Sequence, residues 1–309
     1  MITVLAGGVG AAKFLEGLAA VMPPEHITVI ANTGDDAEFH GLHVSPDIDT
    51  MLYTLAGIVD QERGWGIAGD TFSCLQALRR LGQETWFQLG DRDLATHLTR
   101  TLWLRQGATL SEATEELRRA LGVASRILPM SDAPARTRLR TTAGLLAFQE
   151  YFVKLRQEPE VLEAYFSEAA ASRPAPGVLE AIGEAQGVIV APSNPILSIG
   201  PILAVPGIRE ALRNTAAPVA AISPIVGGRA LKGPADRILM SLGLGASAAA
   251  VAELYRDLVN IFVLDLEDAS LQEEVERKGI KSVITQTVMS TSEARQDLAR
   301  KVLEGLARK

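Results

Sequence analysis

The first 31 residues constrain the fold most, because two short apolar runs flank a glycine loop and a helical pattern. The runs are 2–6 (ITVLA) and 27–31 (ITVIA), and neither contains a charged residue. Between them, "GGVGAAKF" precedes apolar residues that recur at helical spacing from Phe14 to Met22. Continuous apolar runs are typical of parallel strands that are covered on both faces. The opening therefore predicts a strand, a loop, a helix and a second parallel strand.

The C-terminal half repeats this alternation of apolar runs and helical patterns. Such alternation indicates an α/β protein with a doubly wound, mainly parallel sheet. The predicted strands are 188–191, 218–222 and 261–265, and the predicted helices are 177–185, 207–213, about 234–242 and 247–258.

The middle of the chain has a different pattern. From about residue 50 to 175 it is mainly helical, with one apolar stripe at Leu94, Leu98 and Leu102 and with Ser111 as a cap for the next helix. We expect a helical insertion or lid packed over the sheet edge, inside a single domain that spans 1–309.

Composition and charge exclude several classes of protein. The net charge of −7 argues against a nucleic-acid protein, which usually has a basic face. The single cysteine, Cys74, allows no internal disulfide and no thiolate zinc cluster, and its apolar helical surroundings predict a buried thiol. No apolar stretch reaches the ~20 residues that span a bilayer, and the start lacks the basic stretch of a signal peptide. We expect a soluble cytoplasmic protein with no membrane partner.

The glycine loop is the first candidate binding site. Gly7, Gly8 and Gly10 would expose backbone N–H groups at a helix N-terminus, which suits a phosphate. No Gly-Lys-Ser/Thr follows, and the G-x-G-x-x-G pattern is poor, so neither a P-loop nor an NAD site is indicated. Lys13 would add positive charge. The alternatives are a tight turn without a ligand and a solvated lysine.

An acidic segment, Gly34–Thr50, is the second candidate site. It holds five carboxylates and two histidines in seventeen residues. Asp36, Asp47 and Asp49 are candidate ligands for Mg²⁺, which prefers carboxylate oxygens together with water and phosphate. Capping of the following helix would account for one or two of these carboxylates, but not for all five.

Other candidates lie in loops at the ends of predicted elements. Arg92, in "GDRD", would point at a phosphate or a polar ring, or form a surface ion pair, and His97 would be a core histidine. Ser193, Asn194 and the turn Gly227–Gly228 follow strands, where ligands bind in open α/β sheets. Together these residues predict a protein for a phosphorylated ligand, a nucleotide above all, with an acidic metal site that suits phosphoryl-type transfer.

Seven of these motifs occur in an order that resembles one known family. They are "GGVGAAKF", "NTGDD…HGLHVSPDIDT", "RGWGIAGDTF", "LGDRDLATH", "MSDAPART", "APSNPILSIGPI" and "SPIVGGRALKGPA", between residues 7 and 235. The chain resembles the 2-phospho-L-lactate transferase family of deazaflavin coenzyme F-420 biosynthesis over nearly its whole length. One departure is Ala133, where family members often carry an aspartate, which puts a second metal or donor contact there in doubt.

The resemblance implies a Rossmann-like sheet with added helices, a homodimer and a Mg²⁺-dependent reaction. In that reaction a phospho-three-carbon acid moves from its guanosine diphosphate derivative to the ribityl hydroxyl of Fo, a deazariboflavin, and GMP leaves. Asp49 and Arg92 are implied to contact Fo, with Asp49 orienting the hydroxyl or accepting its proton. Asp36 and Asp47 are the candidates for Mg²⁺. The implied nucleotide site comprises Gly7, Gly8, Gly10, Lys13, Ser193, Asn194, Gly227 and Gly228.

Two questions stay open at this point. A related family shares the glycine loop and the sheet but is thought to bind nucleotide sugars as a regulator without catalysing this transfer. The sequence also does not distinguish lactyl, enolpyruvyl and glyceryl donors, because they differ by a few atoms.

Overall fold

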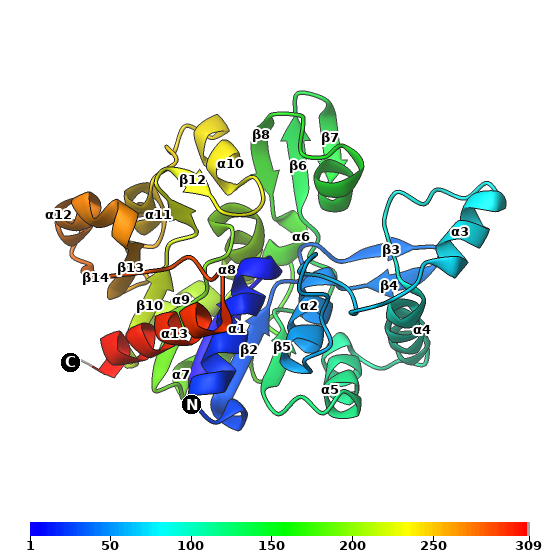
Figure 1. The fold of residues 1–309 in the computed structure, drawn as a ribbon, viewed down its shortest axis with the longest axis horizontal. Helices are drawn as coiled ribbons and strands as arrows, with labels where there is room; N and C mark the ends of the chain where they lie inside the picture. Colours follow the sequence, from blue (N-terminus) through cyan, green and yellow to red (C-terminus); the bar gives the residue numbers. More distant parts are fainter. Residues whose placement is uncertain (308–309) are drawn as a thin grey trace.

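Seven parallel strands form the central sheet of the computed structural model, which describes residues 1–307 (Figure 1). The strand order is β14-β13-β10-β9-β1-β2-β5, and every pairing is parallel. The five predicted strands are confirmed to within one residue, whereas the edge strands β5 and β14 are additional. The bounds are β1 Ile2–Ala6, β2 Ile27–Ala31, β5 Arg126–Pro129, β9 Gly187–Val190, β10 Val219–Ile222, β13 Ile261–Asp265 and β14 Lys281–Thr285.

The strand order determines where a ligand can bind. From β1 the chain proceeds outward to β2 and β5 on one side of the sheet, and it later returns to β9 and proceeds to β10, β13 and β14 on the other. The direction of the connections therefore reverses between β1 and β9. In open α/β sheets, ligands bind beyond the carboxyl ends of the strands at such a switch point.

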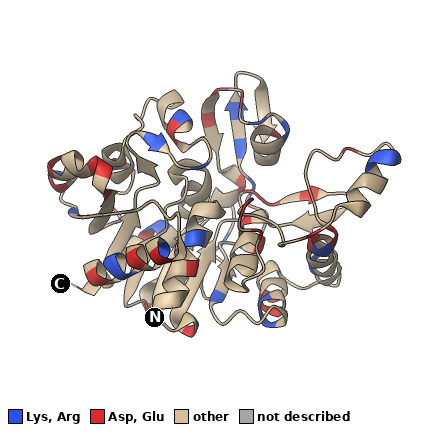
Figure 2. Ribbon diagram, in the orientation of Figure 1, with Lys and Arg blue, Asp and Glu red and all other residues tan. Residues whose placement is uncertain are grey.

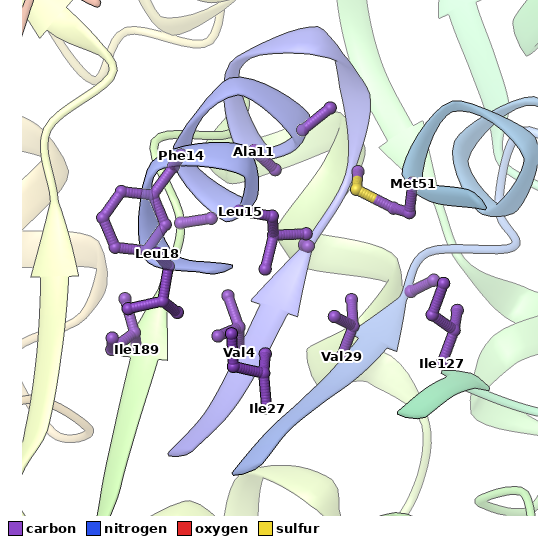
Figure 3. Packing of buried hydrophobic residues seen from close by; sticks show 14 of the residues in the cluster. Val4, Ala11, Phe14, Leu15, Leu18, Ile27, Val29, Met51, Ile127 and Ile189 are labelled. Atoms are coloured by element: carbon purple, nitrogen blue, oxygen red, sulfur yellow. The ribbon is translucent and has the colours of Figure 1, made fainter. Parts of the chain in front are cut away.

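Successive residues of each strand pack on opposite faces of the sheet. Val4 and Ile189 belong to the core under one helical layer, whereas Leu5 and Val190 belong to the core under the other. Figure 3 shows the apolar side of α1 facing Val4, Val29 and Ile189 of the central sheet. The doubly wound α/β fold is confirmed. The first layer comprises α1 Gly8–Val21, α2 Pro46–Leu55 and α13 Ser292–Ala307, and the second comprises α7 Val178–Gly183, α8 Gly200–Ala204, α9 Ile208–Asn214 and α11 Ala248–Leu254.

The segment between about residues 50 and 175 is helical only in its first part. Beyond Arg126 the helical expectation is wrong, since an antiparallel sheet of order β7-β6-β8 occupies that part. Exposed Arg138 and Arg140 alternate there with buried Leu139, which is a strand pattern. In Figure 1 this sheet lies above the central sheet, and α3, α4 and the β3–β4 hairpin extend to one side. The bounds are β3 Ala37–Phe39, β4 Leu42–Val44, α3 Ser73–Arg80, α4 Asp91–Arg105, α5 Leu110–Ala120, β6 Arg138–Thr141, β7 Gly144–Ala147, η2 Glu150–Lys154 and β8 Val161–Tyr165.

Three local expectations in this segment are corrected. Leu98 and Leu102 are both 55% exposed, because α4 turns a polar face inward instead. The cap of α5 is Thr109, which forms a complete capping box, and not Ser111. Cys74 is exposed, so the predicted buried thiol is also wrong.

The remaining elements are short. None of the described helices is long and apolar enough by itself to cross a membrane; only one pair bent by 89°, Pro195–Ala204 with Ile208–Asn214, has the combined length and composition. The remaining bounds are η1 Pro24–His26, α6 Ser167–Ala170, η3 Pro195–Ile199, β11 Ile225–Val226, β12 Arg229–Ala230, α10 Ala235–Ser241, η4 Leu266–Leu271 and α12 Gln272–Glu276.

Candidate active site

A pocket of about 740 Å³ lies at the switch point, beyond the carboxyl ends of the strands. Gly7 follows β1, Ser193 follows β9, Ser223 follows β10 and Thr287 follows β14, and all four line the pocket. The rest of the wall comes from α2, α4, η2, the loop between α2 and α3, and the segments that precede α4 and η2. Its lining includes Tyr53, Trp65, Trp86, Phe87, Asp93, His97, Phe148 and Phe152.

The three positions of the loop require glycine for different structural reasons. A Cβ at Gly7 would lie 2.8 Å from Oδ2 of Asp47, and one at Gly10 would lie 2.5 Å from the carbonyl oxygen of Pro192. These two positions therefore allow close packing within the protein. Gly8 has a φ of +73°, and a Cβ there would have no described atom within 4 Å, so this glycine alone faces open space in the pocket.

A carboxylate already occupies the N-terminus of α1. The backbone N–H of Gly8 donates to Oδ1 of Asp47 at 2.8 Å, and that of Gly7 donates to Oγ of Ser193 at 3.3 Å. The positive end of the helix dipole stabilises this negative charge. Two of the loop amides that we expected to bind phosphate are thus bound to the protein itself.

The side-chain amide of Asn32 bridges the carboxylates of Asp47 and Asp35. The Nδ2 of Asn32 donates to Oδ2 of Asp47 at 2.9 Å and to Oδ1 of Asp35 at 3.0 Å. Both carboxylates are buried and line the pocket. Burial raises the pKa of Asp47 to about 6. Burial, and then the charge of Asp47, raise the pKa of Asp35 well above its usual range.

The predicted ligand Asp36 lies outside this pocket. Its Oδ2 accepts a hydrogen bond from Oγ of Ser45 at 2.8 Å and lies 3.1 Å from Nε2 of His43. It lines a smaller neighbouring pocket of about 350 Å³ instead. The neighbouring Asp35 lies beside Asp47 instead. The sequence did not distinguish Asp35 from Asp36, because the two are adjacent in the same turn.

The Asp35–Asp47 pair fits a hard cation that phosphate oxygens complete. Within residues 1–307 no group of three or more His, Cys, Asp or Glu side chains is arranged to hold a metal ion. Mg²⁺ usually takes only one or two carboxylates together with water and substrate phosphates. Burial is the first cause of both raised pKa values, and a cation bound between the two carboxylates would lower them. Figure 2 shows the acidic residues that gather near the start of α2.

Asp49 forms a buried ion pair in the floor of the pocket. Oδ2 of Asp49 accepts from one terminal nitrogen of Arg100 at 3.1 Å, and Oδ1 accepts from the other, so the pair is bidentate. Arg100 is fully buried. A carboxylate has about four lone-pair sites, so Asp49 can still accept a hydrogen bond from a ligand.

A buried polar chain from α4 continues beyond this ion pair. Nδ1 of His97 lies 3.6 Å from Oδ2 of Asp49, and its Nε2 lies 3.1 Å from Oδ1 of Asp93. Asp93 also accepts from the hydroxyl of Tyr53 at 2.7 Å. Burial alone would raise the pKa of Asp93, but His97 and Tyr53 outweigh it and hold that pKa below its usual range. Asp93 and His97 stand four residues apart in the sequence, and this spacing is the signal that could have revealed the inward polar face of α4.

The remaining predicted residues divide between the pocket and other places. Lys13, Ser193 and Asn194 line the pocket. Arg92 does not: its side chain is 58% exposed, and its guanidinium donates to the carbonyl oxygen of Ala68 at 2.6 Å. Gly227 and Gly228 form the tip of the β11–β12 hairpin and do not line the pocket either.

An aromatic wall, which sequence reasoning did not predict, faces the carboxylates. Phe148 and Phe152 stack with ring centroids 5.3 Å apart, and Phe87 stacks on Phe39 at 4.0 Å. Trp86 packs edge-on against both members of the second pair. Such a wall suits a planar ring ligand.

An α/β sheet with an apolar pocket of this size and a few convergent polar groups at its switch point is typical of enzymes for small molecules. The family model described as 2-phospho-L-lactate transferase CofD matches residues 2–304. The chain belongs to this family and is a transferase.

Relatives over the whole length carry two activity names. A protein of Streptomyces griseus named phosphoenolpyruvate transferase is 46% identical, over 98% of this chain and 97% of that one. A protein of Methanothermobacter thermautotrophicus named 2-phospho-L-lactate transferase is 44% identical, over 98% and 97%. A solved structure from Bacillus halodurans, of the UPF0052 family, covers 98% of each chain with a TM-score of 0.66 at 15% identity, which shows a shared fold.

Proposed function

We propose that this transferase moves a phospho-three-carbon-acid group, 2-phospho-L-lactate or phosphoenolpyruvate, from its guanosine diphosphate derivative to the ribityl hydroxyl of Fo. GMP is released and Mg²⁺ is required. One observation carries the proposal: a single pocket combines an aromatic wall with two carboxylates and a lysine beside a glycine loop. The wall fits the deazaflavin ring, and the polar side fits a diphosphate with its cation.

The pocket residues divide the chemistry among them. Trp86 and Phe148 hold the ring, and Asp49 accepts a hydrogen bond from the ribityl hydroxyl. Because Arg100 fixes both oxygens of Asp49, the role that the geometry favours is orientation of the hydroxyl. Asp35 and Asp47 would hold Mg²⁺, which supplies positive charge to the diphosphate.

The bond changes are those of a phosphoryl-type displacement. The hydroxyl oxygen forms a bond to the phosphorus that bears the three-carbon acid, and the bond from this phosphorus to the oxygen of GMP breaks. GMP keeps the electron pair of that bond, and the hydroxyl proton, which Asp49 holds through its hydrogen bond, passes to solvent water. Phosphoryl transfer needs mainly positioning and charge stabilisation from a protein, which the carboxylates and lysines of the pocket could supply.

The donor acid and the assembly stay open within this proposal. Relatives with the two names are 46% and 44% identical, so similarity does not separate a phosphoenolpyruvate donor from a phospholactate donor. We also expect a cytoplasmic homodimer, which light scattering after size exclusion and localisation of a tagged chain would test. The family match favours the transferase over the regulator that binds nucleotide sugars.

The test is an Fo titration followed by a transfer assay. Fo fluorescence is measured with the wild type, with and without Mg²⁺ and GDP, and turnover is then measured with lactyl, enolpyruvyl and glyceryl donors. We expect saturable Fo binding and Mg²⁺-dependent release of GMP with one preferred donor. Asp49→Asn should lower turnover, and a melting curve checks that the variant still folds, because it leaves buried Arg100 without its charged partner. Arg92→Gln should leave turnover within about two-fold because Arg92 lies outside the pocket. No Fo binding under any condition, with a thermal shift by a UDP-sugar, would overturn the proposal in favour of the regulator.

A further inference from the structure

Two lysines of the pocket form no ion pair within 4 Å among the described residues, although the charge of Glu16 acts on Lys13 from farther away. Lys13 belongs to α1, and Lys232 belongs to the loop between β12 and α10; both line the pocket. In the described part of the chain, the lysines that form ion pairs with carboxylates are Lys154, Lys278 and Lys301. The positive charges of Lys13 and Lys232 are therefore available to a ligand.

Lys232 reaches from the C-terminal half of the chain to the glycine loop. Its Nζ lies 3.4 Å from the place of a Cβ on Gly64, and the same place is 2.6 Å from Cγ1 of Val9 in the glycine loop. Burial lowers the pKa of Lys13, and the charge of Lys232 lowers it further. The two ammonium groups thus stand near enough to repel each other, and an anion between them would relieve that repulsion.

The two lysines approach the pocket from separate elements. Lys13 lies in the second turn of α1, and Lys232 lies in the loop between β12 and α10. A diphosphate offers one phosphate to each lysine, whereas a monophosphate offers only one. A lysine binds phosphate as a point charge, so its contribution depends on which phosphate it reaches.

We propose that Lys232 binds the second phosphate of a nucleoside diphosphate and so makes the pocket prefer a diphosphate to a monophosphate. The inference rests on the proposed function, in which the donor is a diphosphate and the product that leaves is a monophosphate. Lys13 holds the first phosphate in both species. Loss of the contact to Lys232 on transfer then favours release of the monophosphate.

The experiment compares GDP and GMP as probes by isothermal titration calorimetry on the full chain, in buffer that contains Mg²⁺. Lys232→Gln should weaken GDP binding about ten- to hundred-fold, the usual range for one charge-assisted contact, and change GMP binding by less than about three-fold. Lys13→Gln should weaken both nucleotides. Arg229→Gln is the matched control, because Arg229 is an exposed cation three residues away that does not line the pocket. Circular dichroism melts check that each variant folds.

The outcomes separate the inference from the proposed function. If the wild type binds GDP and Lys232→Gln binds it equally well, or loses GDP and GMP equally, the role of Lys232 is overturned while the transferase proposal stands. If the wild type binds neither nucleotide, the proposed function itself is overturned.

Discussion

The buried ion pair between Asp49 and Arg100 allows a sharp test of how the pocket floor is built. The side chain of Arg100 is 0% exposed and that of Asp49 is 6% exposed. The substitution Arg100→Met removes the charge and keeps a long side chain. The carboxylate of Asp49 is then buried without its partner.

The expected loss follows from the burial of the pair. Removal of one partner of a buried ion pair destabilises a protein by about 3–5 kcal/mol. Unfolding entropy is about 2.1 cal/mol/K per residue, or about 0.65 kcal/mol/K for 309 residues. The melting temperature of Arg100→Met should therefore fall by about 5–8 °C.

Two further variants make this prediction specific. Arg105→Met changes an exposed arginine of the same helix, whose guanidinium donates only to the carbonyl oxygen of Gly41 among the described residues, and should shift the melting temperature by less than about 2 °C. The double variant Asp49→Leu/Arg100→Met should recover most of the loss, because apolar side chains often replace a buried ion pair at little cost. Calorimetric or circular dichroism melts measure all three. Equal losses in Arg100→Met and Arg105→Met, or a double variant no better than Arg100→Met, would refute the reasoning.

Three more predictions concern other parts of the pocket. Gly7→Ala should destabilise the protein by about 1–3 kcal/mol, because its Cβ would lie 2.8 Å from Oδ2 of Asp47; an unchanged melting temperature would contradict this. In magnesium-free buffer, the free energy of unfolding should fall as the pH rises from about 4 to about 6, because Asp47 keeps its proton in the folded state over the range where the unfolded chain has released it. Urea melts at each pH measure this fall, which Asp47→Asn should reduce; a stability that rises over this range would show that the sign is wrong. Trp86→Ala should weaken Fo binding about ten-fold, since one stacking face of the wall is lost, and an unchanged dissociation constant in the fluorescence titration would exclude that role.

The central sheet could be predicted because its inner strands carry a signal that is independent of the rest of the fold. A run such as 27–31 is apolar on both faces, and only a strand covered by helices on both sides buries it completely. The edge strands β5 and β14 include Arg126 and Lys281, which face solvent, so their apolar runs are too short to recognise. In β6, the arginines at period two do indicate one side of a strand, which the structure confirms, but the mainly helical pattern expected for the whole segment gave no reason to expect a second sheet.

The site could be predicted only where local sequence determines it. Asp47 and Asp49 were predicted from the carboxylates that gather in one segment, and Ser193 from its position after a parallel strand; all three line the pocket. The inward polar face of α4 was missed although Asp93 and His97 stand four residues apart, since leucines at helical spacing indicate a buried apolar stripe with equal force. Burial of Arg100 becomes favourable only through Asp49, which lies 51 residues earlier in the chain.

The carboxylate of Asp47 at the start of α1 has a consequence for how ligands enter. Because it accepts the N–H of Gly8, the positive helix end is neutralised before any ligand arrives. A nucleotide phosphate that approaches alone meets a like charge, whereas one that carries a divalent cation brings the counter-ion with it. We therefore expect nucleotide and cation to bind cooperatively, each raising the affinity of the other by the same factor. The chain would then bind its donor as a metal complex. Without a cation, the Asp35–Asp47 pair would repel the bare nucleotide.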